Sequence, residues 1–246
     1  MPLWFMKPYN LLKRLKCLGG FAAMDPRFAH IRDWIFDLDN CLYPHSSQLF
    51  ELIDQRMTAY IERLLGVDAI EARRVQKMHF HGSGTTLAGL MKHHDVDPHH
   101  FMGDVHDIPL DRLARDDRLA DALTRLPGRK FIHTNGNADY AWKVLDRLGL
   151  AAEINHLHDI FAADLTPKPE AHGYKKLLDQ FGIEPASAVM VEDMVRNLAP
   201  AKQLGMTTVW VDNGSERGNH GYEDAIVDVR ITDVGEWFET ILGDDE

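Results

Sequence analysis

Seven polar residues stand in four short segments, where their types could share one reaction. In chain order they are Asp37, Asp39, Thr134, Asn135, Lys168, Glu192 and Asp193. Each segment follows a run of apolar residues that predicts a short strand. In an open parallel sheet, ligands bind beyond the carboxyl ends of the strands, which share one edge. We therefore expect these side chains to meet in one crevice.

The chemistry of such a crevice follows from its residue types. Several carboxylates would repel one another unless a cation lay among them, and oxygen ligands without cysteine or organised histidine favour Mg²⁺. Lys168 could neutralise phosphate charge, and the Thr134 hydroxyl with nearby backbone amides could bind phosphate oxygens. One aspartate could attack phosphorus to form an acyl phosphate. A second could protonate the leaving oxygen and then activate water.

Alternating strands and helices could position these groups. We expect strands over 34–36, 130–133, 160–163, 188–191, 207–211 and 227–231, with helices over 138–148, 174–181 and 198–204. Strands separated by helices of about 10–15 residues predict βαβ units. The predicted fold class is α/β, a doubly wound, Rossmann-like parallel sheet with helices on both faces.

Residues 45–125 interrupt this alternation with helices alone. Apolar residues at helical spacing predict helices within 50–64, near 86–91 and near 119–123, and Asp68 with Glu71 could cap a further helix. We therefore expect an all-helical cap domain over 45–125. It is inserted into an α/β core made of 24–44 and 126–246.

The net charge of −11 is unevenly distributed along the chain. Residues 1–23 carry +4, so the rest carries −15, which argues against a generally basic nucleic-acid binder. The basic segment resembles neither a secretory signal nor a membrane span. It is expected to be a disordered extension, an interfacial amphipathic helix, or the result of a start codon placed upstream of Met24. The two cysteines, Cys17 and Cys41, exclude a disulfide framework and favour a reducing cytoplasm.

Four motifs carry a family resemblance. FDLDNCLYP, IHTNG, TPKP and VEDMVRN, in this order, resemble the motifs of the haloacid dehalogenase-like (HAD) hydrolase superfamily, and the resemblance covers residues 30–246. It implies that Asp37 is the nucleophile and Asp39 the general acid and base. It also implies that Thr134 and Lys168 bind the phosphoryl group.

The same resemblance implies a Mg²⁺ site. Asp37, Asp193 and the backbone carbonyl of Asp39 would hold the ion, and Glu192 would act around it without binding it directly. Asn197 would orient its neighbours, although it could instead cap the helix that runs through residue 198.

Three residues depart from the usual motifs of the superfamily. Cys41 stands where threonine is common, Met194 where serine often follows the acidic position, and Glu192 where glycine or aspartate is more frequent. None of these changes removes a group that performs the chemistry. They bear on metal affinity and on the geometry of the phosphate-binding loop. Cys41 is expected to pack rather than to react.

The helical insert resembles the cap of the yeast and bacterial pyrimidine 5′-nucleotidases in the segments 84–90 and 105–107. His81, Thr85 and Thr86 are candidates for substrate contact in this region. The insert is also rich in histidine, and we expect a solvated surface rather than a metal cluster. The histidines are His79, His81, His93, His94, His99, His100 and His106.

The expected function is a Mg²⁺-dependent phosphomonoester hydrolase that acts through an aspartyl phosphate. The resemblance favours a pyrimidine nucleoside 5′-monophosphate as substrate, with a sugar phosphate or phosphoglycolate as the runner-up. A haloacid dehalogenase is disfavoured by Asp39, which such enzymes usually lack, and a non-catalytic binding protein is the remaining alternative. The expected partner is a small phosphorylated molecule, without a nucleic-acid polymer or stable membrane insertion. Oligomeric state has no sequence signal.

Overall fold

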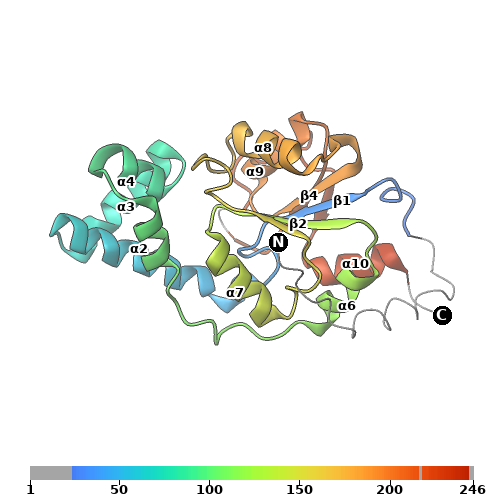
Figure 1. The fold of residues 1–246 in the computed structure, drawn as a ribbon, viewed down its shortest axis with the longest axis horizontal. Helices are drawn as coiled ribbons and strands as arrows, with labels where there is room; N and C mark the ends of the chain where they lie inside the picture. Colours follow the sequence, from blue (N-terminus) through green and yellow to red (C-terminus); the bar gives the residue numbers. More distant parts are fainter. Residues whose placement is uncertain (1–23, 216–217, 244–246) are drawn as a thin grey trace, which may run out of the picture.

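The computed structural model of the chain describes residues 24–215 and 218–243 (Figure 1). The basic segment 1–23 and the last three residues lie outside the described residues. The described part contains a helical unit beside a larger unit that holds a sheet. No helix in these described ranges is long and apolar enough to cross a bilayer.

Six parallel strands form one sheet within the described residues. In chain order they are β1 (Asp33–Phe36), β2 (Arg129–His133), β3 (His156–His158), β4 (Ala188–Glu192), β5 (Thr207–Val211) and β6 (Val229–Ile231). Their spatial order is β3-β2-β1-β4-β5-β6, so the chain leaves β1 in one direction and later returns to its other side. This reversal makes the boundary between β1 and β4 the topological switch point, where open α/β sheets bind ligands. Phe36, the last residue of β1, pairs with Val191 there, and β4 ends one residue later, at Glu192.

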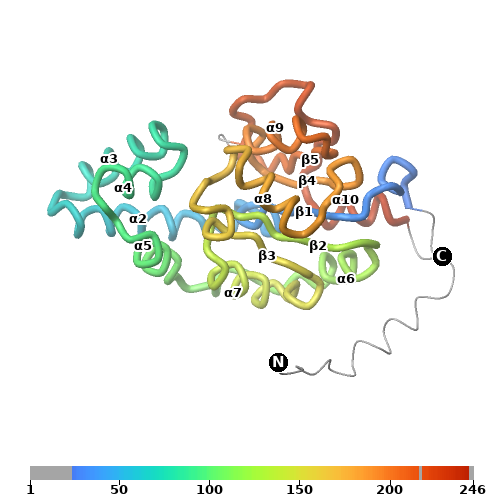
Figure 2. The backbone as a smooth tube through the Cα atoms, turned by 45° about the horizontal axis from the view of Figure 1, so that its top comes forward, coloured from blue at the N-terminus to red at the C-terminus, as the bar shows by residue number. Residues whose placement is uncertain are grey.

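The sheet is buried on both faces because helices cover both of them, and successive side chains of a strand point to opposite sides. Ile35 joins a core cluster with α8 (Ala171–Phe181) and α9 (Val195–Gln203). Its neighbours Trp34 and Phe36 join the other cluster. Helices that pack in this second cluster are α6 (Asp117–Arg125), α7 (Ala138–Leu148) and α10 (Val234–Leu242). Figures 1 and 2 show the two helical layers on either side of the sheet.

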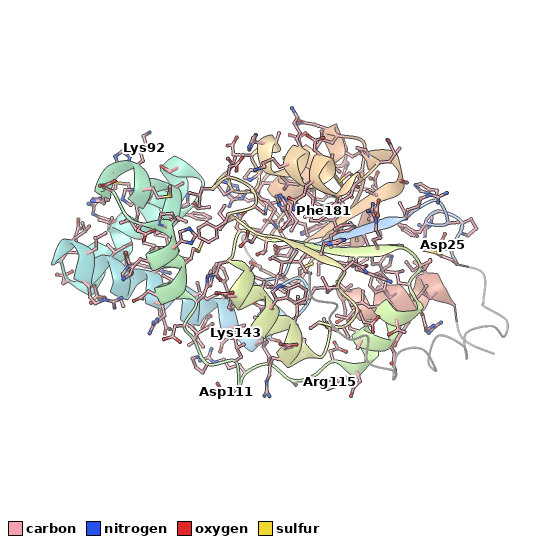
Figure 3. The ribbon with its side chains drawn as sticks, viewed as in Figure 1. Asp25, Lys92, Asp111, Arg115, Lys143 and Phe181 are labelled. Carbon is pink, nitrogen blue, oxygen red and sulfur yellow. The ribbon has the colours of Figure 1, made fainter. Side chains whose placement is uncertain are left out.

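Helix α7 shows how the sequence pattern produces this packing. Its buried side chains recur at helical spacing, at Tyr140, Ala141, Val144, Leu145 and Leu148. Lys143 is exposed and points away from the core (Figure 3). Asn137 caps the first turn by accepting a hydrogen bond from the backbone N–H of Tyr140 at 3.1 Å. Gly149 ends the helix in the left-handed conformation.

The cap is formed by four helices that pack on one another. They are α2 (Leu49–Leu65), α3 (Ala69–Ser83), α4 (Thr86–His94) and α5 (Pro98–Val105). Figure 2 shows them at one end of the molecule, beyond the sheet. Helices α3 and α4 approach closely at Gly89, where a Cβ atom would lie 2.4 Å from the side chain of His79. A larger residue at this position would separate the two helices.

The helices of the insert expected over 45–125 pack against two different parts of the molecule. Helix α6 packs against α10 of the core, whereas α2 packs against α3 and α5 of the cap. Figures 1 and 2 show α6 at the far end of the sheet from the cap. We propose that the cap ends after α5 and that the core resumes before α6.

The third strand lies earlier in the chain than the sequence predicts. The structure has a strand at His156–His158, and the expected strand over 160–163 is a turn. Asp159 stabilises the turn, because its carboxylate accepts a hydrogen bond from the Ala162 backbone N–H at 2.8 Å. The strand itself carries two histidines, so its composition does not show an apolar run.

Removing a buried ring from α10 should destabilise the core. Phe238 is fully buried and meets Trp34 and Phe36 edge-on, at ring-centroid distances of 5.7 and 6.0 Å. Phe238→Ala should lower the free energy of unfolding by about 3–5 kcal/mol through lost contacts and a cavity. Urea denaturation measures this change. Ile70→Ala, at a position that is 84% exposed, is the control and should cost less than about 0.5 kcal/mol. Equal costs for the two variants would contradict the packing described.

Candidate active site

A cavity of about 550 Å³ lies between the carboxyl ends of the strands and the cap. Its core wall contains the polar residues that the sequence singled out, which are Asp37, Asp39, Thr134, Asn135, Lys168, Glu192 and Asp193. The structure therefore brings all seven together. Glu192 is the last residue of β4 and the other six lie in segments that follow strands; the ends of β1 and β4 flank the switch point.

Lys168 is the central cation of this wall. Its Nζ lies 2.6 Å from Oδ1 of Asp37 and 2.6 Å from Oε2 of Glu192, and its side chain is only 2% exposed. Burial alone would lower the pKa of Lys168, but the carboxylates of Asp37 and Glu192 outweigh burial and raise it. The ammonium group therefore stays charged over the physiological pH range.

Asn135 positions the loop that carries Lys168. The Oδ1 atom of Asn135 accepts a hydrogen bond from the Lys168 backbone N–H at 2.8 Å, and its Nδ2 donates to the Lys168 carbonyl at 3.3 Å. The Asn135 amide therefore holds the backbone of Lys168 beside the cavity. The sequence predicted that Asn135 itself binds phosphate. Thr134 is buried, and its Oγ1 accepts from the Gly136 N–H at 3.0 Å. Its own hydroxyl hydrogen remains available to a ligand.

Three buried carboxylates lie close together in this wall, and two of them contact Lys168. Asp37, Glu192 and Asp193 each offer an oxygen, and these oxygens lie within 4.8 Å of one another. Burial and the neighbouring Glu192 raise the pKa of Asp37 to about 7, although Lys168 lowers it. Burial, Glu192 and Asp37 raise the pKa of Asp193 well above its usual value. The cluster is thus short of positive charge.

The donor set of this cluster fits a hard divalent cation, because all of its ligands are carboxylate oxygens. Glu192 already uses both oxygens, since Oε2 accepts from Lys168 and Oε1 accepts from the Met194 backbone N–H at 3.2 Å. Asp37 and Asp193 are therefore better placed to bind the ion directly. Within the described ranges, no other group of three or more acidic, histidine or cysteine side chains meets this distance criterion.

Asp39 is held by two tyrosines that the sequence analysis did not identify. The hydroxyl groups of Tyr43 and Tyr140 donate to Oδ1 of Asp39 at 2.6 and 2.8 Å. Burial raises the pKa of Asp39, whereas these two hydrogen bonds lower it, and the net shift is upward. Tyr43 lies within the first motif and could have been found there. Tyr140 comes from α7 and is brought to Asp39 only by the fold.

The cap supplies the other wall of the cavity. Thr85 and Thr86 line it, and the Thr85 hydroxyl caps α4 by accepting from the Ala88 N–H at 3.1 Å. His81, predicted as a substrate contact, is exposed and does not line the cavity, whereas its neighbour Phe80 does. Adjacent residues of a helix point in different directions, which explains the difference.

The cap wall combines apolar side chains with polar ones, and some of the polar groups are tied to one another. Apolar lining residues include Phe50, Ile53, Met57, Phe80 and Leu87. The buried amide of Gln76 accepts from Thr58 at 2.6 Å and from Arg73 at 3.1 Å, and donates to Asp54 at 2.9 Å. This network fixes α2 against α3, so its amide is engaged before any substrate binds.

Three further residues can be placed. Asn197 lies inside α9, whose N-cap is Met194, so the capping interpretation of Asn197 is wrong.

Cys41 is buried and its thiol donates to the Val191 carbonyl at 3.6 Å. Burial raises the pKa of this thiol well above its usual value, which fits a packing role. His79 of the cap is buried and stacks on His93 at 5.5 Å, so this part of the histidine-rich region is less solvated than expected.

Residues 34–205 match the haloacid dehalogenase-like hydrolase family. The chain belongs to this hydrolase family. It is 26% identical over 191 residues to Phosphate metabolism protein 8 of Saccharomyces cerevisiae, which covers 70% of this chain. The match spans 59% of the length of the yeast protein.

Solved structures of HAD hydrolases share the fold. A HAD phosphatase from Thermococcus onnurineus is 21% identical, covers 87% of this chain and 98% of its own, and has a TM-score of 0.59. L-2-haloacid dehalogenase from Xanthobacter autotrophicus, with chloropropionic acid covalently bound, is 17% identical, with coverages of 87% and 99% and a TM-score of 0.50. Phosphatase and dehalogenase thus share this architecture.

Removing the central cation should destabilise the fold as well as the site. Lys168→Gln leaves the buried carboxylates of Asp37 and Glu192 without their partner, which should cost about 3–5 kcal/mol of unfolding free energy. Urea denaturation in the presence of a chelator measures this cost without a contribution from bound metal. Lys202→Gln, which breaks an exposed pair with Asp228, should cost less than about 1 kcal/mol. A similarly small cost for Lys168→Gln would contradict the arrangement.

Proposed function

We propose that this HAD hydrolase is a Mg²⁺-dependent phosphatase of phosphate monoesters that forms an aspartyl phosphate on Asp37. One observation carries the proposal. Asp37, in contact with Lys168, and Asp39, held by two tyrosines, line the same cavity. The site therefore contains a nucleophile, a fixed cation and a second carboxyl for proton transfer.

Binding of the phosphoryl group would use the groups on the core wall. The Thr134 hydroxyl would donate to one phosphate oxygen, and the Lys168 ammonium would neutralise charge beside the nucleophile. Asp37, Asp193 and the Asp39 carbonyl would hold Mg²⁺, which would supply charge stabilisation for the phosphoryl oxygens. Glu192 would keep Lys168 in place.

The reaction would proceed in two steps, transfer of the phosphoryl group to Asp37 and its hydrolysis. A carboxylate oxygen of Asp37 attacks phosphorus, the bond from phosphorus to the leaving oxygen breaks, and Asp39 gives its proton to that oxygen. The first product leaves as an alcohol. Asp39, now a carboxylate, takes a proton from water as the water oxygen attacks phosphorus. Inorganic phosphate leaves, and Asp37 returns as a free carboxylate.

Asp39 favours phosphate chemistry over dehalogenation. A halide leaves as a stable anion and needs no proton, whereas an alkoxide leaving group does. The two tyrosines that hold Asp39 would have no evident purpose in a halide-releasing enzyme. The name of the yeast relative, Phosphate metabolism protein 8, points in the same direction.

For the substrate we favour a pyrimidine nucleoside 5′-monophosphate, with a sugar phosphate or phosphoglycolate as the second candidate. The cavity volume of about 550 Å³ lies within the range of small-molecule sites. The apolar side chains of its cap wall, Phe50, Phe80 and Leu87 among them, suit a planar base better than a small hydroxylated group. We place the reaction in the cytoplasm, in line with the low cysteine content.

A panel of phosphate monoesters tests the proposal. The protein with Mg²⁺ should release phosphate from UMP and CMP faster than from AMP, phosphoglycolate or sugar phosphates, as measured by phosphate detection. Asp37→Asn should reduce the rate at least about a thousandfold, as expected for loss of a nucleophile. Asp179→Asn, on the exposed face of α8, should leave it unchanged.

Three results would count against these assignments. Absence of phosphate release from the whole panel, together with chloride release from haloacids, would replace the proposed reaction. Preference for AMP would remove the pyrimidine assignment. Full activity of Asp37→Asn would remove the assigned nucleophile.

Metal removal tests the carboxylate cluster separately. Dialysis against a chelator should abolish phosphate release, and Mg²⁺ should restore it. Asp193→Asn should raise the Mg²⁺ concentration that gives half-maximal activity at least about tenfold, because one direct ligand loses its charge. Asp146→Asn, exposed on α7, is the matched control. Activity that persists after chelation, or an unchanged Mg²⁺ requirement in Asp193→Asn, would contradict the metal site.

A further inference from the structure

Two phenols meet at a single oxygen of Asp39. Tyr43 reaches it from the loop after β1 and Tyr140 from the first turn of α7, at 2.6 and 2.8 Å. Both tyrosines are buried, and their hydroxyl oxygens lie 3.5 Å apart. The Asp39 side chain is therefore held from two independent elements of the fold.

This arrangement makes the two carboxyl oxygens of Asp39 unequal. Oδ1 accepts both phenol hydrogens, whereas none of the described residues donates a hydrogen bond to Oδ2. Burial and the nearby Asp39 raise the pKa of both Tyr43 and Tyr140, so the phenols stay protonated and act as donors. Oδ2 is left as the oxygen that can carry a proton to a ligand.

The cap contacts this pair through one ring. His106, the C-cap residue of α5, stacks on Tyr140 with a centroid distance of 4.4 Å and an interplanar angle of 10°. Burial lowers the pKa of His106 to about 4, so the ring packs in its neutral form at physiological pH. Its Cε1 also lies near Gly136 in the loop after β2, where a Cβ atom would come within 3.7 Å. His106 therefore joins the end of the cap to the catalytic face of the core.

We propose that Tyr43 and Tyr140 are positioning residues that hold Asp39 for proton transfer to the leaving oxygen, and that His106 couples this pair to the seating of the cap. The inference rests on the proposed phosphatase function. In the step concerned, the bond between phosphorus and the leaving oxygen breaks while the proton of Asp39 Oδ2 passes to that oxygen. The phenols keep their own protons throughout.

This role has a consequence that depends on the leaving group. An alkoxide must receive a proton as it leaves, whereas p-nitrophenolate is a stable anion at neutral pH and needs none. A misplaced Asp39 should therefore slow the first step with an alkyl phosphate and leave that step unchanged with p-nitrophenyl phosphate. Loss of general structure would slow both.

The experiment compares the first turnover of the two substrate types in the full-length protein with Mg²⁺. Rapid-quench product formation from the best alkyl monophosphate of the panel and the burst of p-nitrophenolate report the same step. Tyr140→Phe and Tyr43→Phe should each lower the first rate about 10- to 100-fold and leave the burst rate unchanged. Asp39→Asn serves as the reference for complete loss of the acid.

The cap contact is tested by a pair of substitutions at one position. His106→Ala removes the stacked ring and should reproduce the selective loss seen in Tyr140→Phe. His106→Phe keeps a flat ring and should restore most of the rate. Tyr60→Phe is the matched control, because this phenol bonds to His100 within the cap at 3.0 Å and does not line the cavity.

The outcomes are distinguishable. A wild-type protein that turns over neither substrate contradicts the proposed function itself. With an active wild-type protein, equal losses on both substrates, or no loss in either tyrosine variant, overturn the positioning role. Failure of His106→Phe to recover the rate that His106→Ala loses overturns the coupling to the cap. Because Tyr43 and Tyr140 come from different elements, unfolding of one variant leaves the other as the test.

Discussion

The site depends on the burial of like charges at the switch point of a parallel sheet. The ends of β1 and β4 bring Asp37, Glu192 and Asp193 within a few ångströms of one another. Lys168 is the cation in contact with Asp37 and Glu192. Such a cluster is costly in a low-dielectric interior unless further positive charge arrives. We propose that this shortage of positive charge is the physical basis for binding a divalent cation, and with it an anionic substrate group. Fold stability and chemistry are thus linked through one lysine.

Much of this core could be predicted because its signals are local. Asp37 and Glu192 each follow an apolar run, and the rule that parallel strands end at one edge places them together. Local sequence signals failed for residues whose position depends on tertiary packing or on the side of a helix from which they project. His81 lies one residue from the cavity-lining Phe80, and Tyr140 reaches Asp39 across the sequence. The position of the third strand was not predicted because its His-Leu-His sequence contains no apolar run.

The core and the cap contribute different kinds of side chain to the cavity. The core wall contains the charged groups that we propose to hold and cleave a phosphoryl group. The cap wall contributes apolar side chains, and some of its polar groups are joined in the network around Gln76. Substrate choice is therefore expected to reside in the cap. The stack of His106 on Tyr140 is the point at which the position of the cap can influence Asp39. The fold alone does not select the reaction, since phosphatases and dehalogenases share it.

The central claim is that a phosphoryl group passes through Asp37. The most direct measurement is mass spectrometry of peptides from protein that has been acid-quenched during turnover of a phosphate monoester with Mg²⁺. The account predicts one phosphoryl group on the peptide that contains Asp37, absent from Asp37→Asn. Phosphate release with the phosphoryl group on another residue, or with no phosphorylated peptide in a quench fast enough to capture a single turnover, would contradict it.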